Sequence, residues 1–162
     1  MPMTFYMSLT GTTQGNMSQG AGIQQGHEDE VLCQALDHEV YIPRDPQSGQ
    51  PTGSRVHKAL TITKVFDKAS PKLYQALATG ERMSDVTFKF FRISTAGTME
   101  HYFTIKLGTA IIVSVKPWIP NCLDPVKESF THMEDISFTY TKIDWTWEID
   151  GVASEDSWLV RK

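Results

Sequence analysis

Residues 42–58 limit most tightly how this chain can fold. They contain three prolines and two glycines, and strand-like sequence lies on both sides of them. Proline cannot donate to a β-ladder and glycine weakens a strand interior, so this stretch is not core sheet. It is also too long for a tight hairpin turn. Long loops inside compact domains are usually functional or disordered, and the prolines favour a stiff, extended excursion, which we call the arm.

The sequence around the arm alternates between apolar and polar side chains, which is typical of half-buried strands. We predict strands over residues 4–10, 30–42, 58–67, 85–94, 100–106, 109–115 and 134–149. Residues 70–80 are the one clear helix, with Ser70 as N-cap, Pro71 at the first helical position and Gly80 at the end. One short helix among roughly seven strands predicts a mainly all-β barrel or sandwich, with residues 1–162 forming a single domain.

Two irregularities interrupt the strand pattern, and three stretches lack it. Gly108 suggests a bend or bulge between two strand segments. The apolar positions change phase between Tyr140 and Ile143, which requires a bulge or a strand buried on both faces. Residues 11–26 and 117–130 are predicted as loops, and residues 151–162 as a mostly polar tail.

Composition and charge exclude several classes of protein. The 162 residues carry a formal net charge of −4, which argues against a general binder of nucleic acid or anionic membranes. No apolar run is long enough to cross a bilayer, and the N-terminus lacks the features of a Sec signal. We therefore expect folding in the cytoplasm. Cys33 and Cys122 form no CxxC pair, so we expect two free, buried thiols.

No residue cluster in the sequence indicates a catalytic, metal or cofactor site. Residues 27–30 (HEDE) resemble a metal cluster, but consecutive strand residues point to opposite faces. Known phosphate, dinucleotide and nucleophile motifs are absent from the sequence, so we predict no cofactor and no enzyme, with an unrecognised Cys–His or carboxylate pair as an open alternative. Trp145 and Trp147 suggest a sugar-binding platform, although we favour a place in the barrel core or a subunit interface. The histidines outside this cluster are expected to be surface or hydrogen-bonded residues: His38, His57, His101 and His132.

Several segments together resemble the hemolysin-coregulated protein (Hcp) family, the inner-tube subunits of the bacterial type VI secretion system. They are residues 26–30 (GHEDE), 45–53 (DPQSGQPTG), 55–58 (RVHK), 66–68 (FDK), 100–104 (EHYFT), 120–125 (PNCLDP) and 134–140 (EDISFTY), with Ser70, Pro71, Leu77, Gly80 and Glu81. The resemblance covers nearly the whole chain. It departs from the family in a short segment between residues 15 and 26, in Trp147 where relatives commonly have His, and in the last nine residues.

The resemblance implies a fold and a set of partners. The fold would be a β-barrel of two antiparallel sheets with one helix and a long protruding loop. Six copies would form a ring, and rings would stack into a tube inside a contractile sheath. Contraction would export the tube and its tip spike without a signal peptide, and small effector proteins could travel in the lumen. A monomeric β-barrel that binds carbohydrate or protein is the alternative.

The arm is where we expect subunits to meet. Its polar side chains would give adjustable contacts within a ring or between stacked rings, and we expect residues 43–57 to project from the barrel. The predicted interface residues are Arg44, Asp45, Gln47, Ser48, Gln50, Thr52, Arg55, His57 and Lys58.

Overall fold

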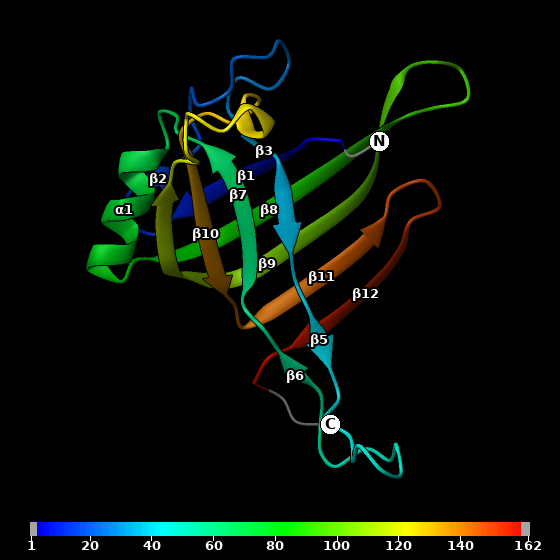
Figure 1. Ribbon diagram of the computed structural model, residues 1–162. Coiled ribbons are helices and arrows are strands. Elements are labelled where there is room, and N and C mark those ends of the chain that lie inside the picture. Colours follow the sequence, from blue (N-terminus) through cyan, green and yellow to red (C-terminus); the bar gives the residue numbers. More distant parts are fainter. Residues whose placement is uncertain (1–2, 160–162) are drawn as a thin grey trace.

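The computed structural model describes residues 3–159, which form one curved β-structure with a helix packed beside it (Figure 1). In chain order the elements are β1 (Phe5–Gly11), β2 (Gly15–Asn16), β3 (Val31–Cys33), β4 (Ala35–Asp37), β5 (Val40–Tyr41), β6 (Val56–His57), β7 (Leu60–Val65), α1 (Ser70–Thr79), β8 (Arg82–Ile93), β9 (Met99–Trp118), η1 (Pro125–Lys127), β10 (Met133–Thr139), β11 (Lys142–Trp147) and β12 (Val152–Ser157). The prediction of a mainly all-β fold with one short α-helix is confirmed.

The strands form two antiparallel sheets of very different size. The larger has ten strands, and its main path runs β2-β1-β8-β9-β10-β7-β4. β11 and β12 extend it from β9, while β5 and β6 form the second sheet at the base of the arm. The segment from β3 to β4 pairs first with β1 and then with β7, although no continuous ladder closes the barrel. The structure therefore has the two antiparallel sheets that we expected, in a barrel that is curved but open.

The core lies between the inner faces of the curved sheet and is closed on one side by α1. Alternation along β7 buries Leu60 and Ile62, while Thr61 and Thr63 are only partly buried. Phe88 of β8 and Phe138 of β10 meet edge to face in this core, with ring centroids 6.1 Å apart. Burial of such large apolar side chains supplies most of the driving force for folding.

Strand β9 changes its pairing partner partway along its length. The irregularities predicted at Gly108 and between Tyr140 and Ile143 both lie at this change. This strand pairs with β11 up to Gly108 and with β10 from Ile111 onward. Thr109 between them has a φ of 48°, so the bend expected at Gly108 is confirmed. The predicted single strand over residues 134–149 was wrong, because β10 and β11 are separate strands that follow one another along β9. The phase change between Tyr140 and Ile143 is the break between them and not a bulge.

Helix α1 ends as predicted but begins differently. Gly80 has a φ of 68°, and its N–H bonds to the carbonyls of Ala76 and Leu77, which closes the last turn. The prediction that Ser70 is the N-cap was wrong, because Ala69 occupies that position without a side-chain cap. The Ser70 hydroxyl instead accepts a hydrogen bond from the Asp67 N–H at 3.0 Å and donates to Glu134 at 2.7 Å.

Three further predictions need correction. The expected strand over residues 30–42 is three short strands, because its segments pair with β1, β7 and β6 in turn. The predicted polar tail, of which residues 160–162 lie outside the described range, contains an edge strand, β12, whose first four residues are exposed while its backbone pairs with β11. Cys122 is exposed, whereas Cys33 is buried, and both are free thiols. None of the helices in residues 3–159 has the length and apolarity needed to span a bilayer.

Candidate functional site: the arm and its root

The arm is an ordered hairpin that projects from the barrel beyond β5 and β6 (Figure 1). Val40 pairs with His57 and Tyr41 with Val56, and an isolated bridge joins Arg44 to Pro51 farther out. The Thr52 N–H donates to the Pro43 carbonyl at 2.8 Å, and the Asp45 N–H donates to Gln50 at 2.9 Å. These bonds hold the two sides of the arm together, so its prolines sit where no ladder bond is required.

Asp45 organises the tip of the arm. Its carboxylate accepts from the Gln47 N–H and from the Ser48 hydroxyl, each at 3.0 Å. Those donors favour the ionised form and lower the pKa of Asp45. Gly49 has a φ of 73°, a left-handed conformation that glycine adopts without steric cost. The tip is thus a defined turn that presents polar side chains to solvent.

The root of the arm, which we define as Arg55, His57 and their partners, is fixed to β12 by an ion pair. The Arg55 guanidinium donates to both oxygens of the Asp156 carboxylate, at 2.5 and 2.9 Å. A third bond reaches the carbonyl of Ser157 at 2.6 Å. The guanidinium holds the pKa of Asp156 well below its usual range, so the carboxylate stays ionised. A bidentate contact of this kind fixes direction as well as distance.

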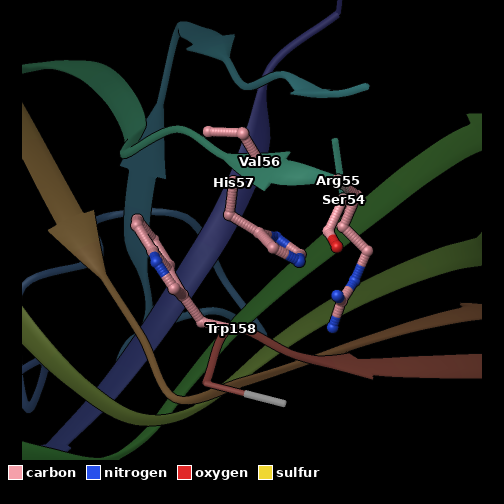
Figure 2. A pocket seen from close by; sticks show the side chains of 5 residues that line it. All are labelled: Ser54, Arg55, Val56, His57 and Trp158. Carbon is pink, nitrogen blue, oxygen red and sulfur yellow. The ribbon is translucent and has the colours of Figure 1, made fainter. Parts of the chain in front are cut away.

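His57 adds a second set of root contacts, and its ring lies between Trp158 and Arg55 in Figure 2. Its side chain is 1% exposed, and Nε2 lies 2.8 Å from Asp156 Oδ2. Nδ1 lies 2.7 Å from the hydroxyl of Tyr140, and the Trp158 ring stacks on the imidazole with centroids 5.6 Å apart. His38 reaches the same Tyr140 hydroxyl at 2.8 Å from the other side.

A polar cavity of about 360 Å³ opens beside the root, lined by Ser54, Arg55, Val56, His57 and Trp158 (Figure 2). Its cationic and aromatic lining comes from the arm and from the C-terminal end of the described chain. The side chains that form it also make the root contacts described above. The cavity is therefore part of the attachment of the arm to the barrel.

The structure divides the nine predicted interface residues into two groups. Seven lie outside the root, all exposed except the half-buried Asp45: Arg44, Asp45, Gln47, Ser48, Gln50, Thr52 and Lys58. Lys58 pairs with Glu39 at 3.0 Å and lies over the ring of Tyr41. The other two, Arg55 and His57, bind their own barrel. An interface role for these residues remains a prediction.

Reasoning from sequence missed the partners that make the root. Tyr140, Asp156 and Trp158 all lie about a hundred residues from the arm along the chain, and His38 lies in the short link between β4 and β5 that leads into the arm. Trp158 and Asp156 stood in a segment that was predicted to be a polar tail. An aromatic residue and an acid at alternate positions in that tail were the available signal.

The two other candidate sites from the sequence, the tryptophan pair and residues 27–30, make contacts within the fold. Trp145 packs against the hydrophobic core, in agreement with the favoured prediction, and Trp147 meets Tyr102 edge to face with centroids 5.7 Å apart. Residues 27–30 lie in a turn and not on a strand, which corrects the geometry assumed for them. The His27 ring stacks on Tyr6 with centroids 3.9 Å apart, and its Nδ1 lies 2.7 Å from Glu30.

Comparison with known proteins identifies the family. The family model described as "Type VI secretion system effector, Hcp" matches residues 6–147. A "Major exported protein" of Pseudomonas aeruginosa is 55% identical over 161 residues, which cover 94% of each chain. A structure described as "Crystal structure of Hcp protein" has a TM-score of 0.91 at 37% identity, covering 97% of this chain and 98% of that one. "Secreted protein Hcp3 from Pseudomonas aeruginosa" has a TM-score of 0.79 at 45% identity, covering 95% and 99%. With matches that span nearly its whole length, the chain belongs to the Hcp family of the type VI secretion system.

Proposed function

We propose that this chain is a structural subunit of a type VI secretion inner tube. Six copies close into a ring, rings stack into a tube, and contraction of a surrounding sheath exports the tube behind a tip spike. Membership of the Hcp family supports this reading, and the 55% identical relative carries the name "Major exported protein". In this role the chain acts by shape and contact and is not an enzyme.

The observation that carries the proposal is an arm that is fixed at its root and polar at its tip. Arg55 and His57 attach it to Asp156, while the tip residues Gln47, Ser48 and Gln50 are exposed. An exposed hairpin that is ordered before it meets a partner loses little conformational entropy on binding. Polar contacts also suit an assembly that must come apart after export, because buried hydrophobic interfaces are typical of permanent complexes.

The open edges of the sheet favour a ring of identical copies. Among the strands described, β12 pairs only with β11, and β4 pairs only with β7. Unpaired strand edges promote uncontrolled association unless something covers them. A head-to-tail contact that closes by rotation covers one such surface on every copy with a different surface of its neighbour. The lumen of such a ring would hold small effector proteins.

Native mass spectrometry and negative-stain imaging of the purified protein test the proposal. We expect closed rings of six and, at high concentration, stacks of rings. Reversing two exposed charges with Arg44→Glu and Lys58→Glu should leave the rings intact and shorten the stacks. Lys106→Glu with Lys116→Glu, an equal double reversal on two exposed residues of β9, is the matched control. A clean monomer at high concentration would overturn the proposal and favour a monomeric module that binds carbohydrate or protein.

A further inference from the structure

The hydroxyl of Tyr140 bridges two histidines at the root of the arm. It lies 2.7 Å from Nδ1 of His57 and 2.8 Å from Nε2 of His38, which belong to opposite sides of the arm. Tyr140 is buried, and burial together with the nearby Asp156 raises the pKa of the phenol, which therefore keeps its proton. The Tyr140 hydroxyl can donate one hydrogen bond and can accept others through its oxygen, and a nitrogen of each imidazole contacts it.

The ionised Asp156 determines the direction of every hydrogen bond in this chain of groups. A carboxylate only accepts, so Nε2 of His57 donates to Asp156 Oδ2 at 2.8 Å. Nδ1 of a neutral His57 must then accept the Tyr140 proton. The Tyr140 oxygen is left as an acceptor, and Nε2 of a neutral His38 donates to it. Without an added proton, each of the three contacts from Asp156 through His57 and Tyr140 to His38 Nε2 has one donor and one acceptor.

The hydrogen bonds among His38, Tyr140 and His57 can accommodate one added proton but not two. An added proton on His38 binds at Nδ1 and leaves the hydrogen bonds among His38, Tyr140, His57 and Asp156 unchanged. A proton on His57 reverses the bond to Tyr140, whose hydroxyl then donates to His38. When both imidazoles are charged, each donates an N–H to the Tyr140 oxygen. The hydroxyl proton of Tyr140 then has no acceptor among these side chains. A buried donor without a partner and two neighbouring cations both destabilise this state.

We propose that the Tyr140-bridged pair of His38 and His57 is an acid-sensitive latch, which holds the arm to its own barrel with up to one added proton and releases it with two. The inference goes beyond the proposed function, because it concerns the attachment of the arm within one chain. It applies to the chain whether or not rings form.

The charged groups around His38 favour the neutral imidazole at neutral pH. Burial lowers the pKa of His38 first, His57 on β6 lowers it further, and Asp37 at the end of β4 opposes them. Asp156 on β12 is neutralised by Arg55 of the arm, and Lys58 is paired with Glu39. An opened arm exposes His38 to water and restores its ordinary pKa, so the open state binds the proton more readily. The closed arm therefore has its full stability above the open-state pKa of His38; below that pH the first proton weakens the latch, and the second proton releases it.

Hydrogen–deuterium exchange of the full-length protein tests the latch, with rates corrected for the intrinsic effect of pH. Between pH 7.5 and pH 5, we expect protection of residues 40–57 to fall severalfold, because the open state takes up protons that the closed latch holds less readily. His38→Gln keeps a side-chain N–H donor for Tyr140 but cannot take a proton. We expect this variant to keep the protection of its arm at pH 5.

His132→Gln is the matched control, because His132 is exposed and lies outside the root. This variant should lose protection in the arm as the parent does. A second readout is the tautomer of each histidine in long-range ¹⁵N–¹H spectra at pH 7.5, where both rings should carry the proton on Nε2. Equal pH profiles for the parent and His38→Gln, or a His38 proton on Nδ1 at pH 7.5, would overturn the latch.

Discussion

The Lys64 ammonium and the Glu134 carboxylate form an ion pair in which neither side chain is exposed to solvent. They are cross-strand neighbours, since Glu134 on β10 lies opposite Lys64 on β7. Lys64 also donates to Asp67 Oδ1 at 2.9 Å and to the Ser70 hydroxyl at 3.0 Å, and Ser70 donates to Glu134. The pair therefore ties the first turn of α1 to the sheet beneath it.

Removing one partner of this pair should destabilise the fold strongly. Lys64→Met leaves the Glu134 carboxylate buried without its counter-ion, which typically costs about 3–5 kcal/mol. Urea unfolding at pH 7 measures the difference. The double variant Lys64→Met with Glu134→Leu should recover most of the loss, because no unpaired charge remains. Lys58→Met, which breaks an exposed pair, is the control and should change stability little. A Lys64→Met protein as stable as its parent would contradict this account.

Gly22 is expected to tolerate no side chain, although residues 11–26 have the composition of a simple loop. A Cβ at Gly22 would lie 1.8 Å from the carbonyl oxygen of His27 and 2.8 Å from that of Glu30. Gly22→Ala must therefore displace backbone, and we expect a lower melting temperature and faster amide exchange over residues 17–30. Gly53→Ala, where a Cβ meets nothing within 4 Å, is the matched control. Equal melting temperatures for the two variants would show that the loop readily shifts.

The features predictable from sequence were those that depend on near neighbours in the chain. Alternation along residues 4–10 and 58–67 identified β1 and β7, since alternate residues of each strand face the core, although Tyr6 on the other face of β1 is buried as well. Proline and glycine identified the arm because they exclude a ladder locally. Gly80 ended the helix for the same kind of reason, as its positive φ is a property of that one residue.

The failures of prediction involve contacts between distant segments. Ser70 looked like an N-cap, but Lys64 and Glu134 draw its hydroxyl into the core. β12 has no apolar alternation, because as a polar edge strand it depends on β11 for its hydrogen bonds. The contacts at the root of the arm could not be predicted from the sequence for the same reason, since 101 residues separate Arg55 from Asp156. Only a folded chain shows that an arginine in the arm and an acid in the tail are partners.

The two cysteines should differ sharply in reactivity. Burial raises the pKa of the Cys33 thiol and denies reagents access to it, whereas Cys122 is exposed in the loop after β9. At pH 8 we expect an aromatic disulfide reagent to modify one thiol per chain in the native protein and two in guanidinium chloride. Cys122→Ser should abolish the native reaction, while Cys33→Ala should not. Two native thiols per chain would contradict the burial of Cys33.

Asp156→Asn should loosen the arm at neutral pH without unfolding the barrel. Asparagine removes the charge that pairs with Arg55 and one of the two oxygens that its guanidinium contacts. We expect faster amide exchange over residues 40–57 at pH 7.5 and little change in the core strands. Asp150→Asn, a loss of the same charge in the exposed turn between β11 and β12, serves as control. Unchanged exchange in the arm would mean that its own hairpin bonds hold it in place.

Deleting residues 47–53 should impair the stacking of rings and leave the fold of the subunit intact. The deletion removes the exposed tip and the bridge between Arg44 and Pro51, but it leaves Arg55 and His57 in contact with Asp156. The melting temperature should therefore stay close to that of the parent, because no core residue is lost. Negative-stain images should show stacks of rings shortened or absent, since the deletion removes four of the nine predicted interface residues, Gln47, Ser48, Gln50 and Thr52. A deletion variant that builds tubes of normal length would place those contacts elsewhere on the barrel. The surface of β12 would then be the next one to test, since this strand lies beside the root and pairs with β11 at the margin of the described sheet.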